Sequence, residues 1–350
     1  TLLLFFSFFS LSQNEFTLSG SIYESEGQET LIGANIIFPD LNTGTITNEY
    51  GFYSITLPSG VYSLTISYLG YNTVNEIVIL DQNLIQNFNL VSNSDVLDEI
   101  VLETDVERLN IKTPQMSVNA LNANSIKKIP VVFGEADVVK AITLLPGVSN
   151  GGEGTGGFNV RGGSNDQNLI LLDEATLFNS SHLFGLFSVF NPDAIKNLKL
   201  YKGGIPAKYG GRIASVLDIY QKEGNKNEFH GNGGIGLIAS RILLEGPFEK
   251  GKGSFLFGGR STYAHLFLPL FDVDNIAYFY DLNTKLSYRL DLENKIYLSG
   301  YFGRDVFNVS NSFENTYGNT VVNFRWNHLF SEKLFSNLSL IYSDYYYGLD

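Results

Sequence analysis

The feature that most constrains the fold is a long alternation of side-chain types toward the C-terminal end of the sequence. Between Tyr278 and Leu290, Tyr and Leu occupy most alternate positions, and residues such as Asp281 and Lys285 lie between them. Successive side chains of a strand point to opposite faces, so this segment is predicted to be a strand with one apolar and one polar face. The segments 322–327 and 337–343 repeat the pattern.

This alternation admits two interpretations. A soluble antiparallel sheet also alternates when one face is buried and the other meets water. A transmembrane strand needs about ten residues of the same pattern, with aromatic side chains near its ends. The length of the Tyr278–Leu290 segment and the aromatic content, 20 Tyr and 27 Phe, favour membrane strands. We expect about six of them between residues 225 and 350.

The first quarter of the sequence has a different pattern of short strands. Tyr62, Leu64 and Ile66 alternate with Ser and Thr, and turn signals such as Pro39-Asp40 and Pro58-Ser59-Gly60 separate such runs. Six or seven short strands in fewer than 80 residues are typical of a small β-sandwich.

Glycine clusters and short strands alternate between Ala141 and Ile219, which indicates an α/β domain. A helix is predicted over Glu135–Ile142, with acidic residues in its first turn. The continuous apolar run Leu169–Asp173 predicts a strand buried on both faces. A second short helix is predicted to begin at Pro192, with Asn191 as its N-cap.

Composition and the N-terminus narrow the class of protein. The apolar run Leu2–Leu11 is too short to span a bilayer as a helix, and Ser10-Leu11-Ser12 offers a small-residue cleavage pattern. Residues 1–12 are therefore interpreted as the remnant of a signal peptide, with a buried strand or helix as the alternative. The absence of cysteine excludes disulfides and Cys-ligated metals, and a net charge of −13 argues against nucleic acid as a partner.

Two groups of motifs resemble a known family. Arg161-Gly162-Gly163, followed by Lys202-Gly203-Gly204-Ile205-Pro206-Ala207-Lys208-Tyr209-Gly210, resembles the ordered elements of the plug domain of TonB-dependent outer-membrane transporters. Residues 47–71 resemble the carboxypeptidase regulatory-like domain that precedes the plug in many Bacteroidetes-type receptors of this kind. That regulatory-like domain is not catalytic in the family.

The resemblance implies a mainly β protein with five segments. They are a signal-peptide remnant (1–12), a carboxypeptidase regulatory-like β-sandwich (13–91), a linker (92–115), an α/β plug domain (116–224) and the first strands of an antiparallel transmembrane β-barrel (225–350). Plugged outer-membrane transporters have about 22 strands. About six strands cannot close such a barrel, so the sequence is expected to be an N-terminal fragment with a truncated barrel.

The linker contains a candidate for the segment that binds the energising protein TonB. Its residues are Asp98, Glu99, Ile100, Val101 and Leu102. A β-prone pentapeptide in an extended linker is suited to strand addition at the edge of a partner's sheet. The alternatives are an ordinary linker segment and the first strand of the plug.

The resemblance also assigns roles within the plug motifs. It implies that Arg161 lies between plug and barrel and ties them together through ion pairs. A buried arginine needs a carboxylate partner, because an uncompensated buried charge is costly. The alternative is an exposed turn residue. Gly162, Gly163, Gly203, Gly204, Pro206, Tyr209 and Gly210 complete the plug motif.

The function that the resemblance implies is active import of a ligand across the outer membrane. The expected partners are TonB with its inner-membrane energising complex, an unknown imported ligand and outer-membrane lipid; a surface lipoprotein that covers the barrel is also compatible. The sandwich would lie in the periplasm. A non-transporting signalling or adhesion receptor is the main alternative, and a secreted enzyme carrying a regulatory sandwich is a more distant one.

No catalytic, cofactor or metal site is predicted. The four histidines are widely spaced and are expected to be ordinary polar or interfacial residues. Gly231–Gly236 matches GxGxxG, but strand-like residues follow it instead of a helix, so a dinucleotide site is not expected. The adjacent acids Asp173 and Glu174 have no evident partner in the sequence.

Overall fold

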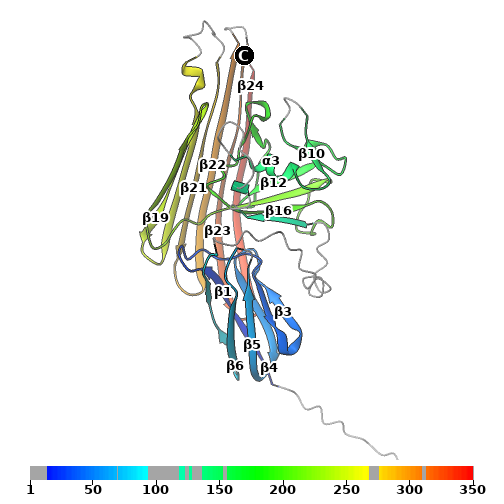
Figure 1. The fold of residues 1–350 in the computed structure, drawn as a ribbon, viewed down its shortest axis with the longest axis vertical. Coiled ribbons are helices and arrows are strands. Elements are labelled where there is room, and N and C mark those ends of the chain that lie inside the picture. Colours follow the sequence, from blue (N-terminus) through cyan, green and yellow to red (C-terminus); the bar gives the residue numbers. More distant parts are fainter. Residues whose placement is uncertain are drawn as a thin grey trace, which may run out of the picture. The chain divides into compact units, whose positions relative to one another are not determined.

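The computed structural model describes residues 14–68, 70–93, 118–122, 126–127, 136–152, 156–267, 276–309 and 313–349. The chain is almost entirely β and divides into two compact units (Figure 1). One unit contains the N-terminal sandwich, and the other contains the plug domain and a sheet of long strands. Within the described ranges, no helix combines the length and hydrophobicity needed to cross a bilayer.

The sandwich consists of two sheets. Its strands in the described residues are β1 (Glu15–Glu24), β2 (Asn35–Phe38), β3 (Thr43–Ile46), β4 (Phe52–Pro58), β5 (Gly60–Ser67), β6 (Val74–Leu80), β7 (Leu84–Ile85) and β8 (Phe88–Leu90). One sheet has the order β4-β1-β7, with β8 also paired to β1, and the other has the order β3-β2-β5-β6. The predicted β-sandwich is confirmed, with two very short strands that the pattern did not resolve.

Alternation explains which sandwich residues form its core. In β5, Tyr62, Leu64 and Ile66 are buried, whereas Val61 and Ser63 point outward. Burying each aliphatic side chain stabilises the fold by about 1.5–3 kcal/mol. The fold class of this unit therefore follows from local patterning alone.

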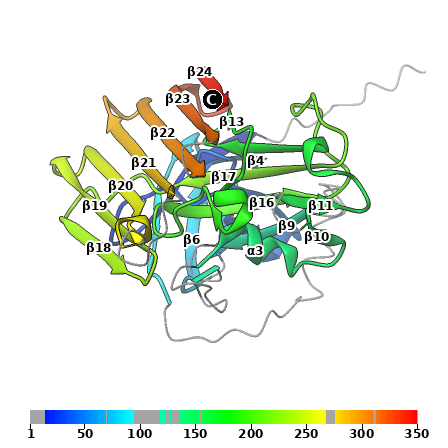
Figure 2. The same cartoon turned by 90° about the horizontal axis from the view of Figure 1, so that it is seen from above.

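The C-terminal sheet consists of long strands joined in chain order. In the part of the chain that the structure describes, they are β18 (His230–Ile235), β19 (Ala239–Glu249), β20 (Gly253–Thr262), β21 (Ile276–Arg289), β22 (Asn294–Val309), β23 (Phe313–Ser331) and β24 (Leu334–Leu349). Strands β18 to β23 pair antiparallel, and β24 pairs with β23. The sheet curves, with the plug domain on its concave side (Figure 2). We call this sheet the wall.

The wall has seven described strands, one more than the six expected. The additional strand is β18, whose sequence HGNGGI is glycine-rich and lacks apolar alternation. It pairs with β19 from His230↔Glu245 to Ile235↔Ser240. Its backbone hydrogen bonds, not its side chains, hold it in the sheet, which is why the pattern did not reveal it.

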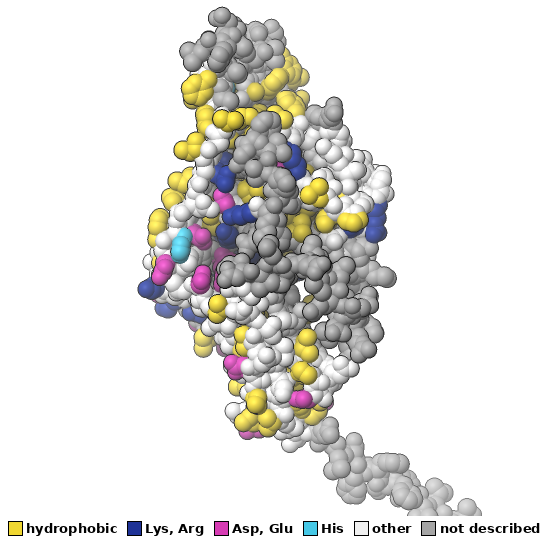
Figure 3. Space-filling view, in the orientation of Figure 1, with side chains coloured by type: hydrophobic (Ala, Val, Ile, Leu, Met, Phe, Trp, Pro, Cys, Tyr) yellow, Lys and Arg dark blue, Asp and Glu magenta, His cyan; other side chains and the backbone are white. Residues whose placement is uncertain are grey.

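The two faces of the wall are inverted relative to a soluble sheet. In β21 the polar residues Asp281, Asn283 and Lys285 are buried toward the plug domain, whereas Leu282 and Leu286 are about 40% exposed on the outer face. Hydrophobic side chains likewise follow the outer margin of the long strands (Figure 3). A soluble sheet would bury the leucines and expose the carboxylate. The inversion supports the membrane interpretation of the alternation.

Aromatic side chains mark two levels along the wall. The Tyr288 ring stacks on Phe248 at 5.7 Å, and Tyr288 and Trp326 both lie opposite Ile296 in the register. Tyr278, ten residues earlier in the same strand, stacks on Tyr280 at 6.5 Å. Ten residues span roughly 34 Å along a strand and about 24 Å at a 45° tilt, which matches the apolar band of an outer-membrane barrel.

We expect an outward charge in this band to oppose insertion. Leu282 lies between the two aromatic levels, so Leu282→Arg should lower the free energy of unfolding of the vesicle-inserted protein by about 2–4 kcal/mol. Leu292→Arg is the matched control, because Leu292 lies in the β21–β22 turn and is 90% exposed. Urea titration of the vesicle-inserted full-length protein measures both. Equal costs at the two positions would contradict the lipid-facing assignment of Leu282.

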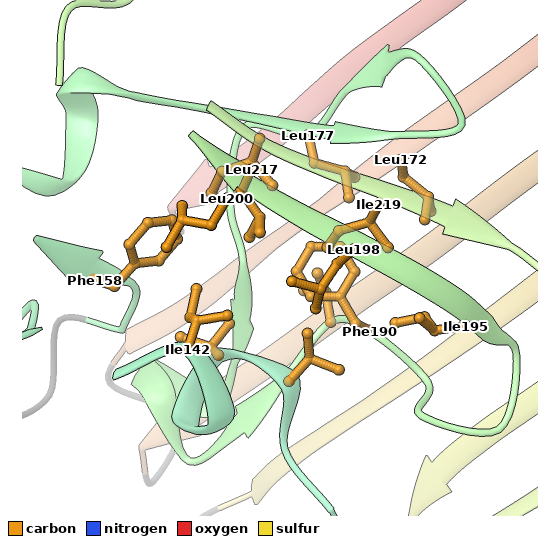
Figure 4. Close-up of a cluster of buried hydrophobic side chains, with 14 of the residues drawn as sticks. Ile142, Phe158, Leu172, Leu177, Phe190, Ile195, Leu198, Leu200, Leu217 and Ile219 are labelled. Atoms are coloured by element: carbon orange, nitrogen blue, oxygen red, sulfur yellow. The ribbon is translucent and has the colours of Figure 1, made fainter. Parts of the chain in front are cut away.

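The plug domain is built on a mixed sheet. Its described elements are β9 (Val118–Asn122), α3 (Val138–Thr143), β10 (Val148–Asn150), β11 (Phe158–Val160), η2 (Asn165–Gln167), β12 (Asn168–Leu172), β13 (Ala175–Thr176), β14 (Ser181–His182), η3 (Leu183–Gly185), β15 (Phe187–Ser188), β16 (Ile195–Tyr201) and β17 (Ser215–Gln221). The central sheet has the order β13-β12-β17-β16-β9, in which only β12 and β17 run parallel. Ile142 from α3 and Phe158 pack against Leu198, Leu200 and Leu217 of that sheet (Figure 4).

The two helices predicted in this domain had different outcomes. Helix α3 is present, but it begins at Val138 and not at Glu135, so its first turn contains no acidic residue. Asp137 is instead its N-cap, and the Asp137 carboxylate accepts a hydrogen bond from the Lys140 backbone N–H at 3.0 Å. The helix predicted at Pro192 is wrong. Asn191 Oδ1 instead accepts from the Asp193 N–H at 3.0 Å, which forms a turn, and Ile195 begins β16. Asparagine favours an N-cap and such a turn for the same reason, so this signal alone could not separate them.

Candidate functional site

The candidate site is the interface between the plug domain and the wall, where buried charged side chains from both meet. One part of it begins at the two-residue turn Asp173-Glu174 between β12 and β13. Leu172 pairs with Ala175, and the turn residues have φ values of +47° and +72°. Positive φ at both positions is the signature of a tight type I′ hairpin. Asp173 and Glu174 each pair with a basic residue of the wall.

Asp173 is the first of these two anchors. Lys285 Nζ of β21 lies 2.9 Å from Asp173 Oδ1, and both side chains are at most 3% exposed. Gln221 donates to the same carboxylate from its backbone N–H at 3.1 Å and from its side chain at 3.2 Å. The Asn323 side chain donates to the Asp173 carbonyl. The ion pair is therefore embedded in further hydrogen bonds, as a buried charge requires.

Glu174 is the second anchor. Its carboxylate lies 3.6 Å from Arg325 Nη1 on β23 and accepts hydrogen bonds from Ser339 and Asn337 on β24. The pair is less buried than that of Asp173, with the Glu174 side chain 20% exposed. One hairpin turn thus contacts three strands of the wall, β21, β23 and β24.

A second cluster surrounds His182 of β14. Its Nδ1 lies 2.7 Å from Asp305 Oδ2 of β22, and its Nε2 lies 3.1 Å from Asp281 Oδ2 of β21. The imidazole stacks on Phe279 at 4.1 Å, with 8° between the rings, and the Tyr301 hydroxyl lies 3.2 Å from Nε2. The side chain is 1% exposed. Both ring nitrogens of His182 therefore face the wall.

The charges around His182 favour its protonated form. Both ring nitrogens face carboxylates, and only an imidazolium can donate from both. Burial by itself lowers the pKa of His182, but the negative charges of Asp305 and Asp281 outweigh burial and raise the pKa above its ordinary value of 6.5. Arg260 also pairs with Asp281. When His182 is protonated, its imidazolium and the Arg260 guanidinium balance the two carboxylates.

Asp193, in the turn that precedes β16, lies at a third junction. Arg241 Nε of β19 donates to its carboxylate at 2.8 Å, and Lys127 Nζ lies 2.6 Å from the other oxygen. Burial alone would raise the pKa of Asp193, but the hydrogen bonds from Lys127 and Arg241 lower it. This carboxylate therefore stays ionised and joins two basic groups from different parts of the unit.

The segment that leads from the plug domain into the wall carries a fourth cluster. Glu223, just after β17, lies 3.0 Å from Lys226 Nζ and 2.9 Å from Lys295 Nζ of β22. Burial alone would raise the pKa of Glu223, but the charges of Lys226 and Lys295 hold it well below its ordinary value. Tyr297 donates a hydrogen bond to the same carboxylate at 3.2 Å.

The residues predicted from the plug motifs lie elsewhere in the plug domain. Arg161 follows β11 at φ +49°, is exposed, and donates from its backbone N–H to the Gly147 carbonyl at 2.9 Å. Burial and then the positive charge of Arg161 lower the pKa of Lys202. The tether between plug and wall that the resemblance implies for Arg161 stays a prediction.

The remaining motif residues lie in two turns. Gly162 and Gly163 follow Arg161, and Gly162 has a φ of +83°. Gly203, Gly204, Pro206, Tyr209 and Gly210 lie in the loop between β16 and β17. The Tyr209 hydroxyl donates to Asp218 at 2.7 Å, which holds this loop against β17. The TonB-binding candidate Asp98–Leu102 lies outside the described residues and also stays a prediction.

Sequence reasoning missed the residues that join plug and wall. His182 was expected to be an ordinary polar or interfacial residue, and it does lie at the interface, between two carboxylates. Asp173 and Glu174 do have partners, Lys285 and Arg325. Those partners lie more than 100 positions away in the sequence. The available signal in the sequence was the presence of charged residues at alternate positions of a predicted membrane strand. Such residues face away from lipid, so each needs a partner of opposite charge on the inner side of the wall.

Comparison with known proteins agrees with this architecture. Residues 18–102 match the CarboxypepD_reg-like domain, and residues 110–216 match the TonB-dependent Receptor Plug Domain. The chain is 27% identical over 225 residues to TonB-dependent receptor SusC of Bacteroides thetaiotaomicron, which covers 61% of this chain and 21% of that protein. It is 28% identical over 235 residues to TonB-dependent receptor P39 of Formosa agariphila, which covers 64% of this chain and 21% of that protein.

A solved structure supports the fold. The siderophore receptor PirA from Pseudomonas aeruginosa aligns with a TM-score of 0.50 and 19% identity, over 67% of this chain and 41% of that chain. Fold and matches together define a plugged-barrel type of architecture. The chain carries a CarboxypepD_reg-like domain and a TonB-dependent Receptor Plug Domain, followed by the strands of the wall. Its match spans about a fifth of the length of each curated relative.

Proposed function

We propose that the protein imports a ligand across the outer membrane, with the plug domain closing the lumen of the barrel. The observation that carries this proposal is the inverted wall, with apolar residues outside and buried charges facing the plug domain. Such a wall suits lipid on one side and a polar, movable occupant on the other. The curated relatives are receptors, and no catalytic role is assigned to this chain.

The chemistry of the plug–wall interface fits a plug that rearranges. Buried aliphatic surface would make release costly, because exposing it to water costs about 25 cal/mol per Å². Ion pairs such as Lys285–Asp173 and Arg241–Asp193 can exchange their partners for water as the lumen hydrates. The interface can therefore hold the plug domain firmly in the closed state, and water can hydrate its charged groups when the plug domain moves.

Energy for this rearrangement would come from TonB. We place its docking segment at Asp98–Leu102, between the sandwich and the plug domain. Strand addition to TonB would let a pulling force reach the plug domain through the chain. The proposal places the protein in the outer membrane and the sandwich in the periplasm, with a ligand outside and a surface lipoprotein as a compatible further partner.

The experiment measures binding of the purified TonB C-terminal domain to full-length protein in outer-membrane vesicles. Ile100→Pro removes a strand N–H and should lower the affinity for the TonB domain at least about tenfold. A tenfold loss corresponds to about 1.4 kcal/mol of binding free energy. Val106→Pro, in the same linker, is the matched control and should bind normally. Equal loss in both variants would move the docking segment. No binding by the unaltered protein would favour a non-transporting receptor.

A further inference from the structure

The N-terminal part of the chain has a one-sided charge distribution. Residues 1–107 contain 14 Asp and Glu and no Lys, Arg or His, whereas all 23 Lys and Arg lie beyond them. The chain's net charge of −13 therefore originates in the segment that contains the sandwich. On the face seen in Figure 3, hydrophobic side chains and a few acidic ones are scattered over the sandwich. Such a surface attracts cationic partners and repels anionic ones.

An apolar stripe crosses the outer face of one sandwich sheet. Val61 of β5 is 64% exposed, and Ile77 and Ile79 of β6 are 73% and 64% exposed. Val61 lies directly opposite Ile79, so the three side chains are neighbours on the same face. We call them the β5–β6 stripe. Three adjacent aliphatic side chains at this exposure are a contact surface more often than a solvated one.

The stripe borders an unprotected sheet edge. Strand β6 is the terminal strand in the order β3-β2-β5-β6. Natural edge strands are usually guarded by Lys, Pro or a bulge. The β6 sequence VNEIVIL contains neither Lys nor Pro, and its described pairing with β5 is continuous from Leu80 to Val74. Its outer backbone N–H and C=O groups are therefore a template for a further strand.

Acidic residues flank this edge. Glu76 precedes Ile77 within β6, and Asp81 follows the last residue of the strand. A strand added to β6 would meet carboxylates close to both of its ends.

We propose that β6 binds an extended, basic segment of a partner protein, which adds to the sheet as a further strand. Its apolar side chains would lie beside the β5–β6 stripe, and its Lys or Arg side chains near Glu76 and Asp81. A second copy of the sandwich is disfavoured as the occupant because it is equally acidic, and an anionic lipid surface is repelled for the same reason. The inference concerns a surface separate from the plug–wall interface and does not depend on import.

The test uses the full-length protein in detergent and a fluorescent eight-residue peptide of alternating Lys and Val. Three peptides are compared with it: alternating Glu and Val, four Lys followed by four Val, and the Lys–Val peptide methylated at every backbone nitrogen. The alternating Lys–Val peptide should bind at least about tenfold more tightly than each of the three. The comparison separates charge, alternation and backbone pairing.

Protein variants locate the site. Ile77→Ser combined with Ile79→Ser should weaken binding of the Lys–Val peptide at least about tenfold. Ile46→Ser combined with Ile85→Ser is the matched control, because Ile46 and Ile85 are 46% and 55% exposed on β3 and β7, neither of which pairs with β6. All four positions are exposed, and circular dichroism checks that folding is unchanged. Glu76→Gln combined with Asp81→Asn should reduce the salt dependence of binding.

Several results would overturn the proposal. They are no binding of the Lys–Val peptide, equal binding of the methylated peptide, or equal loss of affinity in the two pairs of Ser variants. Each would show that the acidic surface attracts cations without a strand-binding edge at β6.

Discussion

Lys285→Met is expected to weaken the closed plug more than any other single change in the wall. The substitution removes the cation that faces Asp173 and leaves a carboxylate buried with a side chain 2% exposed. Breaking a buried pair from one side costs about 3–5 kcal/mol. The measurement is the urea midpoint of plug unfolding in the full-length protein, followed by a fluorophore on a cysteine introduced into the plug domain. The chain contains no cysteine of its own, so the label is specific.

Two further variants make this expectation specific. Asp173→Asn added to Lys285→Met should restore a large part of the loss, since no uncompensated charge remains. Lys252→Met removes a cation from a pair with Glu249 in which both side chains are about half exposed, and it should change little. If Lys285→Met behaved like Lys252→Met, the Asp173–Lys285 pair would not hold the plug.

The second large effect is a loss of plug stability at alkaline pH that depends on His182. The folded protein raises the pKa of His182 above 6.5, because the charges of Asp305 and Asp281 outweigh burial. A group whose pKa is raised in the folded state stabilises that state, and this contribution is fully present at pH values below the pKa of the same group in the unfolded chain. That contribution is lost as the pH rises through the folded pKa. The urea midpoint of the plug domain should therefore fall between neutral and alkaline pH.

His182→Gln should remove this dependence and lower stability at neutral pH, because a neutral amide cannot offset both carboxylates. His230→Gln is the control, since the His230 side chain is 54% exposed on β18. It should leave the pH profile unchanged. A profile that is unaltered in His182→Gln would assign the alkaline loss to other groups, such as wall tyrosines.

The effects expected for Lys285→Met and His182→Gln both arise from polar contacts between the plug domain and the wall, and these contacts bear on how the plug domain could move. The plug domain has an apolar core that includes Ile142, Phe158 and Leu217, and the wall residues Tyr301 and Val321 pack into the same cluster. Its ion pairs with the wall are made by Asp173, Glu174, His182 and Asp193. Leaving the wall would therefore rehydrate these charged groups and also expose the apolar contacts of Tyr301 and Val321.

Local patterning was sufficient to predict much of the fold from the sequence. Alternation in Tyr62–Ile66 and in Tyr278–Leu290 identified the sandwich and the wall, because side-chain direction in a strand depends only on position along it. Where local signals were degenerate, prediction failed. Asn191 stabilises a turn and does not cap a helix. The glycine-rich sequence of β18 lacks the apolar alternation by which strands are recognised.

The ion pairs of the plug–wall interface could not be predicted for a different reason. Asp173 meets Lys285, and His182 meets Asp305, only after both domains have folded and docked. No local rule relates such distant positions. The motif residues that resemblance singled out, such as Arg161 and Tyr209, are those with a local signature, and their described contacts lie within the plug domain.

The central claim is that the wall presents its apolar face to lipid and its polar face to the plug domain. Spin labels on single cysteines at positions 282 and 286, compared with 283 and 287, test it most directly in full-length protein inserted into phospholipid vesicles. Asn283 and Ser287 are buried on the inner face of β21. We expect labels at 282 and 286 to be accessible to dissolved oxygen and shielded from a water-soluble nickel complex. Labels at 283 and 287 should be accessible to neither. Equal access of the nickel complex to 282 and 286 would show that this face meets water, and would contradict the account.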